Sequence, residues 1–425
     1  MVQLFLLLLG ADLIRRRWWI IGAAGLFWMT LGALFFADAF IEEIRITVPY
    51  FAAPLLLDGT LSLATGILTP HARMRRIGKA LVFFAVAILL ITVPRHSAFA
   101  VAMLVGTFLT LDGFWRAGSA LVVRFPGWRP SCVKGIVELL LGLWSLSPWP
   151  SNYRAEVGSD VGLLLMVSAA GLLGLALRVR YMAPDTRLSS ILSTGWPQMP
   201  TAAEILEGPE AAGAPARHQR VSARVHVWTP TGALPRLHHG IERYIAATDA
   251  QGHVSTGHSA LELAPDLYIS HYPAKEIEQS TSDFARLLRA TPDNDVAGTF
   301  QPTYAYESKD WCPSSFQIDV TGIDAAALRA FWAEYRRDTT YNLTNRNCSS
   351  AVVKALDAGL EGVFAPVATP GFLLQLIVSP EFWAAGMLRH RATTMAWTPG
   401  LVLDYVRALT AVLALAPSPR PPAAR

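Results

Sequence analysis

The sequence predicts two parts of different fold class: an all-α bundle of six transmembrane helices, built as three hairpin repeats, followed by an α+β domain. Hydrophobic residues make up 52% of the 425 residues and charged residues only 16%, against about 25% charge in ordinary soluble chains. Most of this bias lies before Arg180. We therefore expect a membrane domain at 1–180, a flexible linker at 181–220, an α+β domain at 221–395, and an amphipathic helix with a disordered tail at 396–425.

Six apolar runs divide the first half, and several reach the roughly 20 residues that cross a bilayer core. The runs are Trp18–Ala37, Tyr50–Thr69, Ala80–Val93, Ala98–Leu121, Val133–Leu146 and Val161–Leu177. Arginines and lysines gather before the first run, in alternate connections and after the sixth. By the positive-inside rule both ends of the bundle face the cytoplasm. The Met1–Gly10 run lacks a basic start and a cleavage site, so we expect it at the lipid interface or as an extension of the first span.

The membrane half repeats itself. Leu55–Gly66 and Leu109–Ala120 align with a shift of 54 residues, and Lys79 and Lys134 recur 55 residues apart. Such a period indicates three hairpins from one ancestral unit. With a basic-Trp-Trp entry at Arg17–Trp19, this half resembles the HdeD-type acid-resistance membrane proteins. The resemblance implies six short spans in a bacterial inner membrane and a stress-associated role.

Three carboxylates fall inside the predicted spans, namely Asp58, Asp112 and Glu138. An unpaired charge in a bilayer costs several kcal/mol, so each is a candidate functional residue. We favour the interpretation that each is protonated or paired with the lysine of the following span and only positions helices. A proton-linked or transport role is the alternative.

The stretch Tyr341–Gly359 places a cysteine, Cys348, at the start of an apolar helix. The residues after it repeat at helical spacing, and Gly359 supplies a stop. Free N–H groups and the positive end of the helix dipole favour an anion at this position and lower the pKa of a thiol. The sequence therefore presents Cys348 as a candidate nucleophile.

A candidate base lies upstream in Gly252–Ala274, where two short strand-like segments flank a Pro-Asp turn. His258 opens the first segment and His271 closes the second. If the segments pair as a hairpin, both imidazoles lie near one end of a sheet. One imidazole then deprotonates the thiol while the other orients it.

The order His258, His271, Asn347-Cys348 resembles the circularly permuted papain-like proteins, relatives of the NlpC-type peptidases that include the lecithin:retinol acyltransferases. The resemblance covers about 221–360 and implies a permuted papain-like α+β fold with Cys348 as nucleophile, His258 as base and His271 orienting it. Tyr341 and Asn347 become candidate oxyanion or supporting residues. The acyltransferases continue with Glu-His, whereas this chain continues with two serines. A buried structural cysteine and core histidines are the alternative interpretation.

Further elements follow from pattern. We expect a strand at Arg224–Pro230, a helix over Val320–Asp338, and two apolar C-terminal helices at Gly371–Leu388 and Gly400–Ala416 that cover the core or lie in the lipid interface. The pair His238-His239 has no metal-ligand motif around it, which favours a solvated turn. Cys132, Cys312 and Cys348 give an odd count and no disulfide framework.

The sequence thus predicts a membrane-anchored cytoplasmic thiol enzyme, with peptide or amide cleavage first and lipid or thioester acyl chemistry second. A non-catalytic stress-associated scaffold or proton-linked membrane protein is the alternative of another class. The predicted partners are the lipid bilayer and a peptide, protein or acyl substrate, with no cofactor and no metal. The net charge of +4 comes mostly from residues that flank spans, and no nucleic-acid motif accompanies it, so nucleic acid is excluded as a partner. Substrate identity and oligomeric state stay open.

Overall fold

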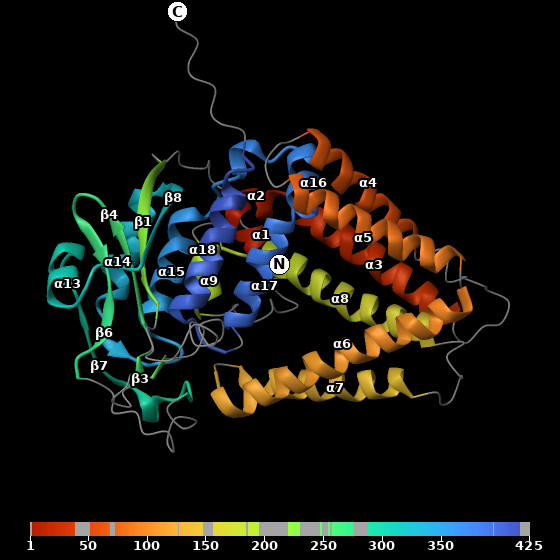
Figure 1. Ribbon diagram of the computed structural model, residues 1–425, viewed down its shortest axis with the longest axis horizontal. Helices are drawn as coiled ribbons and strands as arrows, with labels where there is room; N and C mark the ends of the chain where they lie inside the picture. Colours follow the sequence, from red (N-terminus) through yellow and green to blue (C-terminus); the bar gives the residue numbers. More distant parts are fainter. Residues whose placement is uncertain are drawn as a thin grey trace, which may run out of the picture.

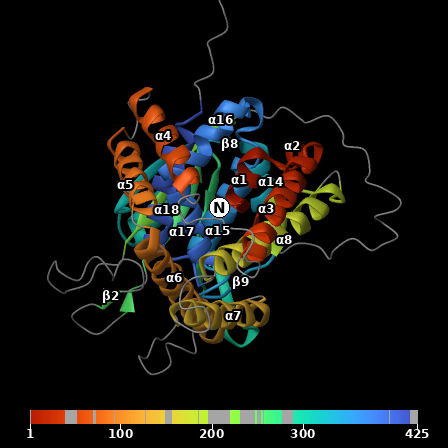
Figure 2. The same ribbon diagram turned by 90° about the vertical axis from the view of Figure 1, so that its right-hand side faces the viewer.

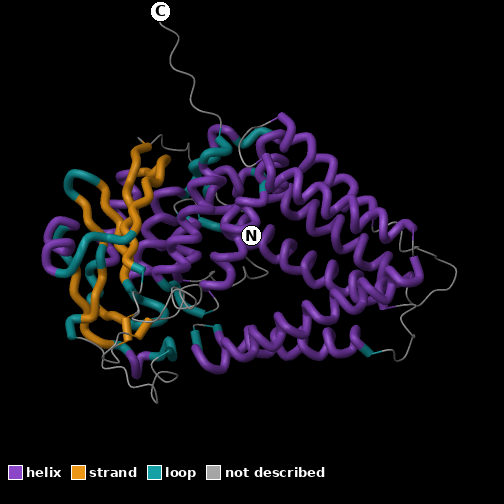
Figure 3. The backbone as a smooth tube through the Cα atoms, in the orientation of Figure 1, coloured by secondary structure: helices purple, strands orange, loops and turns teal. Residues whose placement is uncertain are grey.

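The computed structural model has a helical part and an α+β part that lie side by side (Figures 1 and 3). This confirms the division into two kinds of structure. The described residues are 2–38, 52–68, 73–92, 94–125, 127–147, 156–183, 186–194, 220–229, 247–248, 254–255, 257–275, 288–393 and 395–416.

Each predicted span falls in one long helix. These helices are α3 (Trp18–Asp38), α4 (Ala52–Leu68), α5 (Arg73–Thr92), α6 (Pro94–Val123), α7 (Trp128–Leu146) and α8 (Glu156–Arg180). Among the described residues, Trp18–Ala37 and Val161–Arg180 are long and apolar enough to cross a membrane. A bent pair near the C-terminus would be a third span if it crossed as one unit.

The six helices associate in pairs: α4 with α5, α6 with α7, and α3 with α8. Viewed along their length, the three pairs surround a common centre (Figure 2). Two pairs join helices that are consecutive in the chain, and the third joins the first and last helices, whereas three hairpins in chain order would pair α3 with α4, α5 with α6 and α7 with α8. Glycine allows the close approach of α6 and α7, because a Cβ added at Gly113 would lie 2.4 Å from the Leu139 nitrogen.

The basic ends of these helices meet the α+β part. Lys79 Nζ in α5 donates to the Val378 carbonyl at 3.2 Å. The Val123 carbonyl, at the end of α6, accepts from the Ala290 N–H at 2.7 Å. At the end of α8, beside Arg180, Val179 and Met182 are buried in the core of the α+β part. The residues that the positive-inside rule assigns to one side therefore lie on the side of the α+β part.

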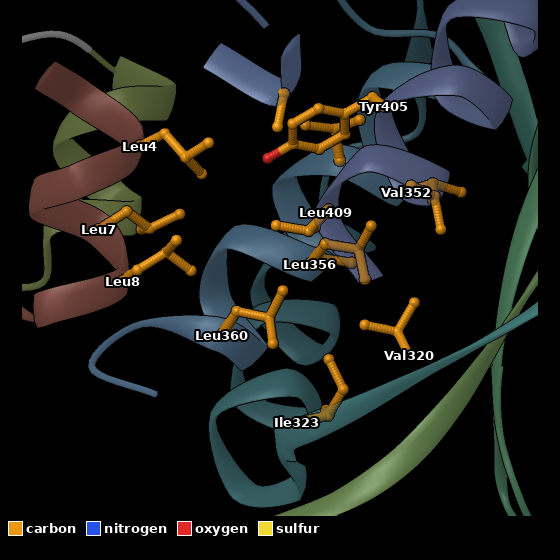
Figure 4. Packing of buried hydrophobic residues seen from close by; sticks show 14 of the residues in the cluster. Leu4, Leu7, Leu8, Val320, Ile323, Val352, Leu356, Leu360, Tyr405 and Leu409 are labelled. Atoms are coloured by element: carbon orange, nitrogen blue, oxygen red, sulfur yellow. The ribbon is translucent and has the colours of Figure 1, made fainter. Parts of the chain in front are cut away.

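The N-terminal run does not extend the first span. Its leucines form α1 (Val2–Leu9), which is followed by α2 (Ala11–Arg16), and both precede α3. Leu4, Leu7 and Leu8 are 0–1% exposed and belong to the core of the α+β part, where they face α15 (Figure 4). The Leu7 and Leu8 carbonyls accept from the N–H groups of Gly362 and Phe364 at 2.9 and 2.8 Å. Apolar burial in the folded domain, worth about 1.5–3 kcal/mol per leucine, takes the place of the lipid contact we expected.

The predicted linker contributes one short helix to the same core. This is α9 (Leu188–Thr194), which contacts α1 and α15. The Glu361 carboxylate accepts from the N–H groups of Leu188 and Ser189 at 2.8 and 3.1 Å and so satisfies the free donors at the start of α9.

A four-stranded antiparallel sheet of order β5-β4-β1-β8 forms the centre of the α+β part. Its strands are β1 (Arg220–Trp228), β4 (His258–Leu263), β5 (Leu267–Ile269) and β8 (Phe316–Asp324). A second sheet of order β6-β7-β9 comprises β6 (His271–Pro273), β7 (Val296–Phe300) and β9 (Thr340–Tyr341), and β2 (Ala247–Thr248) pairs with β3 (Val254–Ser255). The expected first strand and the expected hairpin are present as β1 and β4–β5.

Helices cover both faces of the central sheet. On one face lie α14 (Ala325–Tyr335), α15 (Cys348–Leu360) and α18 (Pro399–Leu413), which share a large apolar core with β1, β4 and β8. Near the other face lies α13 (Tyr304–Asp310), whose Tyr304 packs on a smaller cluster of Trp228, Ala260 and Tyr268. The two remaining helices, α16 (Pro370–Val378) and α17 (Pro380–Thr393), lie between the core and the helical part (Figure 1).

The start of the helix expected over Val320–Asp338 differs from the one observed. Residues Val320–Asp324, which we assigned to a helix, finish strand β8, and α14 begins at Ala325 with the Asp324 side chain as its N-cap. The strand prevails because Val320 and Ile323 are 0% exposed and pack into the core. Gly400–Ala416 also packs there as α18, with Val402, Val406 and Val412 fully buried, so this helix covers the core as one of our two alternatives proposed.

Candidate active site

A capping box fixes Cys348 at the first position of α15. Asn347 Oδ1 accepts from the Ser350 N–H at 2.7 Å, and Ser350 Oγ accepts from the Asn347 N–H at 2.9 Å. Asn347 Nδ2 donates to the carbonyls of Leu343 and Trp397 at 2.7 and 2.9 Å. Asn347 therefore supports the helix start, and its amide hydrogens already have acceptors.

The Cys348 side chain is 6% exposed. Its Sγ lies 3.7 Å from Ser349 Oγ. Burial raises the pKa of the Cys348 thiol, while hydrogen bonds from the backbone and hydroxyl groups of Ser259 and Ser349 oppose that rise. The donors that would stabilise a thiolate are thus in place, but desolvation prevails and keeps the thiol neutral.

His258 opens β4 directly after Gly257, whose φ of +70° suits glycine. Its ring stacks on Tyr272 at a centroid distance of 3.9 Å. Nε2 lies 2.9 Å from Ser270 Oγ and 3.2 Å from Glu307 Oε1. Burial, with a smaller contribution from the neighbouring His271, lowers the pKa of His258 to about 3. The imidazole is therefore neutral at physiological pH.

Glu307 in α13 is the residue that sequence reasoning missed. Its carboxylate is 3% exposed and accepts from the hydroxyls of Tyr268 and Tyr272 at 2.5 and 2.6 Å. Glu307 and Ser270 both lie beside His258 Nε2, and the tautomer with its proton on Nε2 would leave Nδ1 with a lone pair. No local pattern marks Glu307, since a glutamate in a short polar helix is usually a surface residue.

His271 opens β6 instead of closing β5, and its contacts differ from those we expected. Its Nδ1 lies 3.1 Å from the Tyr335 hydroxyl. Its Nε2 points toward β7, because a Cβ on Gly298 would lie 2.5 Å from it. Burial, followed by the positive charge of Arg346, lowers the pKa of His271 to about 4. We expected His271 to orient His258, but Glu307 and Ser270 hold the position beside the His258 Nε2.

Successive side chains of β4 point to opposite faces of the sheet, so His258 and Ser259 lie on different sides. His258 is paired with Trp228, whereas Ser259 is paired with Val227 of the large core. Ser259 Oγ lies 3.1 Å from Ser349 Oγ, so the backbone at His258–Ser259 passes directly beside the start of α15. Among the described residues, no hydrogen bond joins the Cys348 thiol to either imidazole. A reaction through Cys348 and His258 therefore requires a side-chain rotation, as is common in unliganded sites.

Tyr341 and Cys312 pack against the two histidines or their neighbours and hold them in place. Tyr341 in β9 is buried, and its ring lies edge-on to His271 at 5.1 Å. Burial, with a smaller contribution from a Cys348 thiolate, raises the pKa of Tyr341. The Cys312 carbonyl accepts from Trp228 Nε1 at 2.8 Å, and Trp228 packs against His258 at a centroid distance of 5.4 Å. Cys312 thus supports the surroundings of His258 through its backbone.

Within the described ranges, no group of three His, Cys, Asp or Glu side chains is placed to hold a metal ion. His238 and His239 lie outside those ranges.

The carboxylates of the helical part are paired differently from our expectation. Arg116 Nε lies 2.7 Å from Glu138 Oε2, and its Nη2 lies 2.9 Å from Asp112 Oδ2. One arginine of α6 therefore links both carboxylates and joins α6 to α7. We expected the lysine of the following span as partner, but Arg116 is one helical turn from Asp112 and already faces α7. Asp58 lies in α4, and its side chain is outside the described part.

Residues 270–418 are similar to a family described as the IcsB middle domain. The match covers about a third of the 425-residue chain, and it includes His271, Glu307 and Cys348 but not His258. No curated protein and no solved structure matches the chain. The resemblances to HdeD-type and permuted papain-like proteins stay predictions.

Proposed function

We propose that this chain is a membrane-anchored thiol hydrolase in which Cys348 is the nucleophile and His258, held by Glu307, is the base. The observation that carries the proposal is the meeting of two elements 90 positions apart in the sequence. The strand that begins with a carboxylate-bound histidine contacts, through Ser259 and Ser349, the helix that begins with a cysteine.

In the proposed reaction the tautomer of His258 with its proton on Nε2 takes the proton of the Cys348 thiol at Nδ1 after the two side chains are brought together, and the thiolate attacks a substrate carbonyl carbon. The C–N bond of the resulting tetrahedral intermediate breaks, and His258 returns the proton to the leaving amine. Water then hydrolyses the thioester with His258 again as base, which releases the acid and restores the thiol. Glu307 accepts a hydrogen bond from the Nε2–H throughout and stabilises the transient imidazolium.

The N-terminus of α15 supplies the environment for negative charge. The Ser349 and Ser259 backbone N–H groups and hydroxyls surround the sulfur, and the helix dipole adds a partial positive charge. This set takes the place of Asn347, whose amide hydrogens are bound to backbone carbonyls.

Acyl transfer from a lipid or thioester is the second candidate, and one observation favours it. The loop before Cys348 is tied to the helical part, because Thr344 Oγ1 donates to the Leu288 carbonyl at 2.8 Å and Ala290 N–H donates to the Val123 carbonyl. The nucleophile would thus work close to helices that cross the membrane. Both candidates share the acyl-enzyme step and differ in the group that leaves or accepts.

A thiol-reactive acyl probe on the full chain tests the proposal. We expect labelling of wild type, loss in Cys348→Ala, a decrease of about 10²- to 10⁴-fold in labelling rate in His258→Ala, and retention in Cys312→Ser. Mass spectrometry of the labelled peptide identifies the residue. A folded wild type that is labelled at Cys312 or not at all would favour the scaffold, an interpretation that the small exposure of the thiol supports. Comparing amide and thioester probes separates the two enzyme candidates.

We also propose that all six helices α3 to α8 cross the membrane and that the α+β part lies on the cytoplasmic side. Basic ends of these helices contact the α+β part, and this supports the topology. Protease protection in sealed inverted vesicles tests it. Cleavage within the exposed α13 is expected only when the cytoplasmic face is outward, and the opposite pattern would overturn the orientation.

A further inference from the structure

The helices α16 and α17 form an elbow that carries an apolar face without a protein partner among the described residues. They are bent by 65° at a short break, and only as a pair are they long and apolar enough to cross a membrane. On α16, Leu374 and Ile377 are 45% and 46% exposed, and on α17, Trp383 and Met387 are 45% and 60% exposed. Their spacings of three and four residues place each pair on one side of its helix.

The opposite side of each helix is fixed to the folded domain. Phe372, Leu376, Phe382 and Ala385 are buried in the core, and Phe382 packs edge-on against Phe5 of α1 at 6.1 Å. Buried Ser379 at the bend donates to Glu381 at 2.7 Å, and Trp383 Nε1 donates to the Ile377 carbonyl at 2.5 Å. The elbow is therefore held in place by its polar and buried groups while its apolar face points outward.

The elbow lies at the basic ends of the proposed membrane helices. α16 contacts α4, and α17 contacts α5. Lys79 of α5 donates to the Val378 carbonyl, and the Arg391 guanidinium at the end of α17 lies 5.0 Å from the ring centroid of Trp115 in α6. The exposed face therefore continues the exposed apolar surface of helices that themselves present Leu81, Val82 and Phe114.

We propose that the α16–α17 elbow is a membrane-surface element whose Leu374, Ile377, Trp383 and Met387 face enters the interfacial layer of the bilayer beside α4, α5 and α6. The proposal rests on the membrane anchor proposed above. Trp383 has its N–H hydrogen-bonded, and the elbow meets Lys79 of α5 and carries Arg391 near its end. Exposed tryptophan and aliphatic side chains with basic residues nearby are typical of an interfacial anchor. Each helix is too short to span alone, and the bend lets the pair lie along the surface. The bilayer therefore fixes the orientation of the domain that carries Cys348.

Quenching by lipids that carry a nitroxide tests this on the full chain in vesicles. An environment-sensitive fluorophore is attached at Met387→Cys after Cys132, Cys312 and Cys348 are replaced by serine. Phe27→Cys in the middle of α3 is the deep control, and Tyr306→Cys on α13 is the aqueous control, with exposures of 62% and 52%. We expect Met387 to be quenched several-fold more by nitroxide near the headgroup than by nitroxide at the tail end, Phe27 to show the reverse, and Tyr306 to be quenched by neither.

Two results would overturn the inference while leaving the anchor intact. If the label at Met387 emits as in water and is not quenched by either lipid, the elbow lies in water. If it emits as in an apolar environment and is still not quenched, the elbow packs against a second copy or another protein. If Phe27 is also unquenched, the anchor itself is wrong and the inference falls with it. The native tryptophans give a measurement without cysteine replacement: Trp383→Phe should reduce headgroup-level quenching, whereas Trp311→Phe, at 50% exposure, should not.

Discussion

Ser259 Oγ and Ser349 Oγ lie 3.1 Å apart, and this contact joins the residue after His258 to the residue after Cys348. It fixes the start of β4 against the start of α15. The catalytic candidates His258 and Cys348 are the immediate neighbours of these two serines in the sequence.

Glu307→Gln should slow reaction of Cys348 with an acyl probe on the order of 10²-fold or more, because the amide no longer fixes the tautomer of His258 or stabilises its cation. The rate of acyl-enzyme formation by intact-mass spectrometry measures this. Glu262→Gln is the matched control, since Glu262 Oε2 makes a similar contact with His226 Nε2 at 3.1 Å on a neighbouring strand. Equal rates in the two variants would remove Glu307 from the mechanism.

Alkylation of Cys348 should follow a pH profile whose midpoint lies above the roughly 8.5 of a free cysteine, because burial raises the pKa of its thiol. His258, with a pKa of about 3, is neutral throughout this range and adds no acidic limb above pH ~4. Iodoacetamide kinetics followed at the Cys348 peptide give the profile. A midpoint well below 8 would instead indicate a preformed thiolate–imidazolium pair.

Stability of the α+β part should fall as pH decreases from about 6.5 toward 3. His258 has a folded pKa of about 3 against an unfolded value of about 6.5, so in this window the unfolded chain binds a proton that the native chain excludes. Above pH 6.5 the group is neutral in both states and contributes no slope. The expected loss is about 1.4 kcal/mol per pH unit, measured by thermal unfolding in detergent. His258→Gln should flatten the curve, and an unchanged slope would contradict the assignment.

Leu8→Ala should destabilise the α+β part by about 2–5 kcal/mol, because Leu8 is 0% exposed in α1 and its truncation leaves a cavity. Limited proteolysis of the C-terminal region reports the loss. Leu26→Ala in α3, where the side chain is 62% exposed, should change the stability of this region by less than about 0.5 kcal/mol. A similar effect of both substitutions would mean that α1 does not belong to this core.

Arg116→Met should loosen the α6–α7 pair, because it leaves Asp112 and Glu138 without their cation in a region of low polarity. A double-mutant cycle with Glu138→Met should give a coupling energy of about 0.5–3 kcal/mol in detergent unfolding. Arg129→Met, at an exposed position of α7, controls for loss of charge alone. Additive effects at Arg116 and Glu138 would show that the observed pair does not stabilise the hairpin.

Much of the architecture follows from local pattern. The lengths of the apolar runs predicted all six long helices, and the apolar spacing after Cys348 predicted α15. Both predictions succeed because the pattern of residues a few positions apart favours a helix or a strand. The pattern failed at Val320–Asp324, where residues compatible with a helix finish β8. Burial of Val320 and Ile323 in the core outweighs the local helical spacing there.

The sequence by itself determined the two-part composition, the long helices, and a cysteine at a helix start with histidines upstream. The tertiary structure alone decided that Glu307 lies beside His258, that Arg116 pairs with Glu138, and that α1 packs against α15 instead of lipid. The physical reason is that these relations depend on which face of a strand or helix meets a distant segment. Packing of the whole domain sets that choice, and no periodicity along the chain records it.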